Sequence, residues 1–146
     1  MKVLKLGFLS TLVVFLIGFT GASAQEVFVA DLSGDQVNPA VSTDASGTAV
    51  ALLVGNVLVV GGTYDDLSSA VASQIAGGLH IHEAERGSNG GVVFVVSNDG
   101  GTAGTFSGTF ILSDEQVAAL QAGHYYLNLH TANHNPGEIR GQLEQR

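Results

Sequence analysis

Residues 47–64, GTAVALLVGNVLVVGGTY, decide the fold class of this chain. They contain two runs rich in Val and Leu, residues 47–54 and 57–64, with only Gly55 and Asn56 between them. Glycine accepts the positive φ angle that the first position of a type II′ turn requires, so this spacing predicts a β-hairpin with a two-residue loop.

Six further runs of the same kind are separated by Gly, Asn, Asp and Ser, and they predict strands at residues 26–31, 77–82, 91–97, 103–111, 124–130 and 138–144. Residues 98–101, Asn-Asp-Gly-Gly, indicate a second hairpin. Eight strands favour an all-β fold, built as a two-sheet antiparallel β-sandwich, with a flattened barrel as the alternative.

One short crossover helix is expected at about residues 114–122. Ser113 and Gln116 have the S-x-x-Q spacing of a capping box, and Leu112 and Val117 are spaced as a hydrophobic staple. Gly123 provides the left-handed residue that ends a helix. The pattern therefore predicts a helix that covers one end of the β-fold, with Val117 and Leu120 facing the core.

The composition excludes several classes of protein. The 146 residues include no Cys, so neither a disulfide-stabilised miniprotein nor a cysteine-ligated zinc module is possible. The chain has 5 Lys and Arg against 13 Asp and Glu, a formal net charge of -8. Binding to nucleic acid requires a basic patch, and this chain lacks the cations to form one.

The first 24 residues have the form of a signal peptide. Lys2 and Lys5 precede an apolar run at residues 6–19, and residues 22–24, Ala-Ser-Ala, match the site that signal peptidase accepts. We expect cleavage after Ala24 and export, to the periplasm, the cell surface or the medium. The alternative is an uncleaved membrane anchor, although the run is shorter than the ~20 residues that span a bilayer.

The mature chain, residues 25–146, has the length of a single domain. It retains Arg86, Arg140 and Arg146 against all 13 acidic residues, because both lysines lie in the signal. Such a surface repels phosphates and anionic lipid headgroups, so we expect no nucleic-acid partner and no stable membrane insertion after cleavage. The sequence does not indicate whether the protein has a protein partner.

All five histidines lie in the second half of the chain. In a strand, alternate side chains share a face, so His80 and His82 are predicted on one face, with Leu79 and Ile81 on the other. By the same alternation, residues 124–130, HYYLNLH, place Tyr126, Asn128 and His130 on one face, with Leu127 and Leu129 pointing inward.

If these two strands lie together, His80, His82 and His130 converge on a common point. Imidazole ligands without thiolate suit copper, zinc or nickel, and the usual order of affinities favours copper. His134, in the turn at residues 133–137, is either a fourth ligand or an exposed turn residue, and His124 is expected to face solvent. The alternative is that the strand histidines lie on a solvated face, hydrogen-bonded to backbone or to Asn128, without a metal.

Other polar residues have weaker patterns. Glu83, Glu85 and Asn89 suggest a calcium site or a general acid, but the spacing of a calcium loop is absent. In residues 138–143, EIRGQL, Glu138, Arg140 and Gln142 alternate with apolar residues. We expect a structural ion pair between Arg140 and Glu138 or Glu83; the alternative is that Arg140 attracts anions beside the histidines.

Several motifs resemble the CHRD domain, which was first described in chordin and occurs in many secreted bacterial proteins. They are residues 30–39, ADLSGDQVNP; 79–82, LHIH; 87–90, GSNG; 125–131, YYLNLHT; and 136–143, PGEIRGQL. The resemblance covers nearly the whole mature chain. It implies a β-sandwich module of undetermined activity.

A second, more distant similarity concerns the metal. Residues 80–83, HIHE, resemble the copper-ligand strand of copper-zinc superoxide dismutases, and residues 129–130, Leu-His, resemble the later strand that supplies another copper ligand. This implies a Greek-key sandwich of the immunoglobulin or superoxide-dismutase type. The bridging histidine, the zinc loop and the disulfide of those enzymes have no counterpart here.

We therefore expect an exported CHRD-domain binding module, with a copper or zinc site formed by His80, His82, His130 and His134. Asn128, Glu138 and Arg140 are expected to support that site. The alternatives are a copper-dependent oxidoreductase and a metal-free domain for protein interaction or adhesion. Catalytic residues are not assigned.

Overall fold

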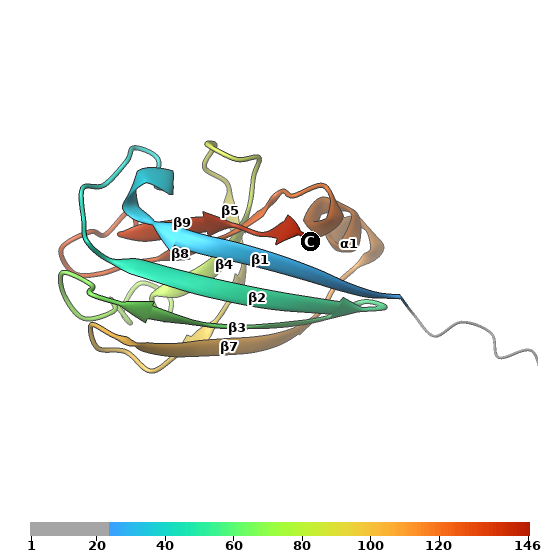
Figure 1. Ribbon diagram of the computed structural model, residues 1–146, viewed down its shortest axis with the longest axis horizontal. Coiled ribbons are helices and arrows are strands. Elements are labelled where there is room, and N and C mark those ends of the chain that lie inside the picture. Colours follow the sequence, from blue (N-terminus) through green and yellow to red (C-terminus); the bar gives the residue numbers. More distant parts are fainter. Residues whose placement is uncertain (1–23) are drawn as a thin grey trace, which may run out of the picture.

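The computed structural model describes residues 24–146, which form a β-rich fold with one α-helix and one 3-10 helix (Figure 1). The predicted signal peptide lies outside the described residues, apart from Ala24. No helix in the described part of the chain is long and apolar enough to cross a membrane. The elements are β1 (Gln25–Ser33), η1 (Gly34–Gln36), β2 (Ser46–Val54), β3 (Val57–Asp65), β4 (Leu79–Glu83), β5 (Gly91–Val95), β6 (Ser97–Asn98), β7 (Gly104–Ile111), α1 (Asp114–Gln121), β8 (Tyr125–Leu129), β9 (Ile139–Gln142) and β10 (Glu144–Gln145).

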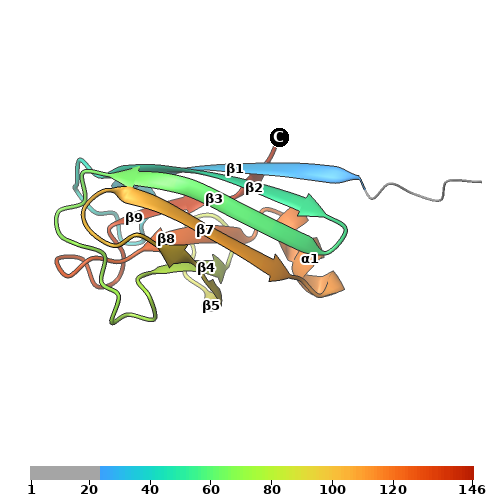
Figure 2. The ribbon, with the colours of Figure 1, turned by 90° about the horizontal axis from the view of Figure 1, so that it is seen from below.

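The strands form a single antiparallel sheet with the order β5-β4-β8-β9-β1-β2-β3-β7-β6, and β10 pairs with β1. The long strands β1, β2, β3 and β7 lie on one side of the molecule, and β9, β8, β4 and β5 lie on the other (Figure 2). The all-β class is therefore confirmed, and the strands in both layers are connected by hydrogen bonds.

The sheet nearly closes into a barrel, which differs from the two separate sheets of the expected sandwich. Its end strands, β5 and β6, follow each other in the chain with only Val96 between them. The backbone N–H of Val96 donates to the carbonyl of Leu79, at 2.9 Å. One run of residues thus pairs first with β4 and then with β7, which joins the edges that a sandwich leaves open.

Each of the eight predicted ranges contains a strand, although 91–97 and 138–144 are both divided between two strands. The hairpin is as predicted: β2 and β3 pair from Val54 with Val57 to Ser46 with Asp65. Gly55 has a φ of 62°, as the first position of a type II′ turn requires.

Helix α1 ends one residue before the predicted boundary. The Oγ of Ser113 accepts from the N–H of Gln116, and the Oε1 of Gln116 accepts from the N–H of Ser113, so the capping box is complete. Leu120 is fully buried and Val117 packs against the core. The helix therefore covers one end of the barrel, as expected.

The core lies between the two layers and takes alternate residues from every long strand. Burial of an aliphatic or aromatic side chain contributes about 1.5–3 kcal/mol, and this interior supplies most of the driving force for folding. Fully buried members from both layers include Phe28, Leu53, Leu58, Ile81, Leu127 and Ile139.

Candidate metal centre

The outer face of β4, β8 and β9 is polar, but it is not solvated. Leu79 and Ile81 point into the core, and the alternate residues of the three strands point away from it. Antiparallel pairing aligns His80 with Asn128 and Asn128 with Arg140, while His82 aligns with Tyr126. All the side chains on this face are at most 9% exposed, and they are His80, His82, Tyr126, Asn128, Arg140 and Gln142.

Loops cover this polar face. The amide of Gln142 donates to the carbonyl of Ala84, at 2.9 Å, and Asn38 donates to the carbonyl of Gly87, at 2.8 Å. The segments at residues 34–45 and 84–90 thus close over the strands. The alternative of histidines on a solvated face is wrong in its burial, because this face is covered, but the hydrogen bonds to backbone and to Asn128 that it supposed are present.

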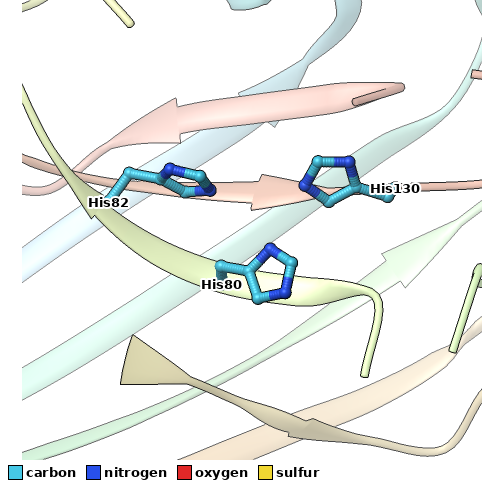
Figure 3. A group of neighbouring side chains, drawn as sticks. All are labelled: His80, His82 and His130. Carbon is cyan, nitrogen blue, oxygen red and sulfur yellow. The ribbon is translucent and has the colours of Figure 1, made fainter. Parts of the chain in front are cut away.

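Three of the five histidines meet under these loops. His80 and His82 come from β4, and His130 follows directly on β8. Each offers one ring nitrogen within 4.8 Å of the other two, and one nitrogen of each ring points toward a shared centre (Figure 3). The pairing of Leu79 with Leu129 creates this convergence, because it places His130 beside the start of β4.

Hydrogen bonds to backbone carbonyls fix the orientation of each ring. Nε2 of His80 lies 2.9 Å from the carbonyl of Ala76, and Nδ1 of His82 lies 3.0 Å from that of Gly90. Nδ1 of His130 lies 2.6 Å from the carbonyl of Asn135. A carbonyl only accepts, so in neutral rings these nitrogens carry the hydrogen and the opposite nitrogens carry a lone pair.

The opposite nitrogens are the ones available to an ion. Nδ1 of His80 and Nε2 of His82 are buried and have no hydrogen-bond partner, and Nε2 of His130 faces the amide of Asn128, at 3.3 Å. Metal-binding histidines commonly use one nitrogen for the ion and donate the other N–H to a carbonyl or carboxylate. His80 and His82 therefore each have a free nitrogen ready for an ion, whereas Nε2 of His130 accepts from Asn128 and would exchange that hydrogen bond for the ion.

Burial also favours the neutral rings that a metal needs. Desolvation lowers the pKa of His82 and of His130 below the ordinary value, although the hydrogen bonds to Gly90 and Asn135 oppose this shift. The neighbouring ring of His80 lowers both pKa values further. A lone pair on neutral imidazole is therefore available at neutral pH.

The other two histidines are not part of this group. His134 lies half-exposed in the turn after β8, and His124 lies half-buried just before β8. The group of close ligand atoms in the described residues contains only His80, His82 and His130, so the structure does not place His134 as a fourth ligand. Glu83 and Glu85 are exposed and also lie outside this group, which leaves the suggested calcium site without support.

The predicted ion pair of Arg140 with Glu138 or Glu83 is wrong. The guanidinium carbon of Arg140 lies 3.5 Å from the centroid of the Tyr126 ring, and Nη1 donates to Asn89, at 3.2 Å. Nη2 donates to Gln142, at 3.4 Å. In the part of the chain that the structure describes, the one salt bridge joins Arg86 to Glu144.

Glu138 instead binds hydroxyl and backbone donors from three loops. Its carboxylate accepts from the hydroxyls of Thr43, Ser68 and Thr131, at 2.7, 2.9 and 2.7 Å, and from the backbone N–H of Ser68, at 2.8 Å. Burial raises the pKa of this fully buried group, but the hydrogen bonds outweigh it and hold the pKa below its ordinary value. Glu138 thereby fixes the segment that follows His130.

The sequence pattern did not reveal three contacts of the site. The ring of Tyr126 stacks on His82, with centroids 5.0 Å apart and planes inclined by 10°. Thr43 and Ser68 lie 95 and 70 residues from Glu138 in the chain, and no local spacing connects them to it. Alternation predicted the face on which Tyr126 lies, but not its stacking partner.

Comparison with known proteins identifies the family. The family model of the CHRD domain matches residues 28–143, which include every strand of the polar face. Neither a curated protein nor a solved structure matches the chain. The match covers well over half of the sequence, and the chain therefore belongs to the CHRD domain family.

Proposed function

We propose that this protein is an exported CHRD-domain binding module that holds one transition-metal ion, copper or zinc, between His80, His82 and His130. The observation that carries the proposal is the set of three converging nitrogens in Figure 3, in which two are buried without a partner and every opposite nitrogen faces a carbonyl. An unpaired buried polar atom costs about 1–3 kcal/mol, and a metal ion would offset that cost at His80 and at His82.

The chemistry of the donors favours copper or zinc. Three imidazoles without thiolate suit Cu(II), Zn(II) or Ni(II), and copper has the highest affinity among them. Nitrogens bound at about 2.0 Å from one ion lie at most about 4 Å apart, so any pair near the 4.8 Å limit of the group closes slightly when the ion binds.

Export is the second part of the proposal, and it depends on residues 1–24. The charged start, the apolar run and the Ala-Ser-Ala site support it. Mass spectrometry of the protein made in a bacterial host with an intact export pathway tests it. We expect a mature chain that begins at Gln25, recovered outside the cytoplasm. An intact Met1 terminus on protein retained in the cytoplasm contradicts it.

The metal site is tested by titration of the mature, chelator-treated protein with Cu(II) and with Zn(II) in a calorimeter. We expect one ion per chain for wild type and a loss of at least about 100-fold in affinity for His82→Ala, because one of three ligands is removed. His124→Ala and His134→Ala are matched controls that should bind like wild type. Equal binding by His82→Ala, or no stoichiometric uptake by wild type, refutes the metal site.

A copper-dependent oxidoreductase is the second candidate, because three protein ligands leave a coordination position open for a substrate. The test is superoxide consumption by the copper-loaded protein, compared with the same concentration of free copper. A rate no higher than that of free copper excludes this candidate. If the protein binds no metal at all, an interaction or adhesion domain is the remaining function.

A further inference from the structure

A cavity lies where the covering loops meet β9. Its volume is about 380 Å³, and it opens between the segment at residues 35–40 and the segment at residues 86–87. Arg140 and Gln142 contribute to it from β9. The polar residues that line it are Asp35, Gln36, Asn38, Arg86, Arg140 and Gln142.

This cavity gathers most of the positive charge in the described part of the chain. Residues 24–146 contain three cationic side chains, all of them arginines, and two of these line the cavity. Arg86 is half-exposed and pairs with Glu144, whereas Arg140 is only 2% exposed and contacts no carboxylate. A buried guanidinium without a counter-ion is costly, so its retention needs an explanation.

The contacts of Arg140 leave most of its hydrogen-bonding capacity unused. A guanidinium has five N–H donors, and here they meet two neutral amide oxygens, at 3.2 and 3.4 Å, and the face of Tyr126. These are long contacts compared with the 2.7–2.9 Å of charge-assisted bonds to carboxylates. Burial lowers the pKa of Arg140, the phenol of Tyr126 opposes this shift, and the nearby charge of Arg86 adds to it.

We propose that this cavity binds the carboxylate of a small organic acid, with Arg140 as the principal anchor and Arg86 as a second positive group near the entrance. The amides of Gln36, Asn38 and Gln142 line the same cavity, but their N–H groups donate to backbone carbonyls, so the two arginines carry the recognition. Asp35 also lines the cavity and repels an anion, so it limits the affinity. This proposal is independent of the metal, because none of the three histidines lines the cavity.

The test is an NMR titration of the metal-free mature protein with sodium succinate, with sodium chloride at equal ionic strength as reference. We expect saturable shifts of the Arg140 side-chain signals with succinate and none with chloride. Arg140→Lys keeps the charge but loses the planar fork, and we expect about tenfold weaker binding or more.

Two surface variants keep the proposal testable even if Arg140→Lys does not fold. Arg86→Gln should weaken binding about threefold to tenfold, and Asp35→Asn should strengthen it by a similar factor, because each changes the charge at the cavity. Arg146→Gln and Asp66→Asn change the total charge equally, away from the cavity lining, and should leave binding unchanged. Absence of saturation, or equal effects of the cavity and control variants, overturns the proposal.

Discussion

Replacement of Glu138 by Gln tests how firmly the loops are held over the histidines. The carboxylate accepts four hydrogen bonds, two at Oε1 and two at Oε2. Hydrogen bonds to a charged group contribute about 1.5–3 kcal/mol each, but glutamine keeps one oxygen, and the hydroxyls of Ser68 and Thr131 can turn to accept from its amide. The loss is therefore mainly that of charge assistance, about 3 kcal/mol in total.

Urea denaturation at pH 7, followed by circular dichroism, measures this loss, and Glu85→Gln is the control because Glu85 is exposed. A 3 kcal/mol loss corresponds to a fall in Tm of about 10 °C for a domain of this size. The folded-state pKa of Glu138 lies below the ordinary 4.5, so its stabilisation is present above pH 4.5 and is lost as the pH falls through the folded-state value. A difference below about 1 kcal/mol at pH 7, or one that persists unchanged well below pH 4.5, refutes the reasoning.

Three further predictions concern the metal and the backbone around it. Zn(II) at 100 times its Kd should stabilise the mature protein by about 2.7 kcal/mol. Calorimetry should show this as a rise in Tm of about 10 °C, and His82→Ala should abolish the rise. Gly137→Ala should cost about 2 kcal/mol in urea denaturation and weaken metal binding, because Gly137 has a φ of 128° and a Cβ there lies 2.3 Å from Oδ1 of Asn128. Gly87→Ala is the control, because Gly87 has a φ of 82° but no atom lies within 4 Å of a Cβ placed there. Equal losses of stability in the two variants contradict the role of Asn128. Without metal, stability should fall as the pH drops below 6.5, because burial lowers the pKa of His82 and His130 and the unfolded chain takes up protons first. Urea midpoints from pH 8 to 5 check this, and a rise toward acid contradicts it.

The local parts of the fold could be predicted because short-range chemistry determines them. The turn at Gly55 and the capping box at Ser113 depend on residues within four positions of one another. Closure of the sheet could not be predicted in the same way. It depends on a change of pairing partner at Val96, from β4 to β7, and the residues around Val96 read simply as one continuous strand.

The same difference between local and long-range determinants applies to the site. Alternation predicted that His80 and His82 share a face, and the proximity of β4 and β8 brought in His130. The burial of that face was not predictable, because it results from loops such as residues 34–45 that are remote in the chain. The partners of Arg140 were missed for the same reason: Asn89 and Tyr126 are 51 and 14 residues away, and formal charge alone pointed to a carboxylate.

The polar face also predicts that binding of the proposed ion is linked to folding. A stable apo domain would fill the space under its loops with apolar side chains, since unpaired buried nitrogens destabilise the fold. Here two ring nitrogens and the Oδ1 of Asn128 lack partners within one small volume, while the loops above them are held by Glu138, Asn38 and Gln142. Natural proteins break such local rules mainly at functional sites. The strong anchoring of the loops and the poor satisfaction of the groups beneath them are therefore consistent with the proposed site, in which the fold would hold the histidines in place and an ion would compensate for the burial of their free nitrogens.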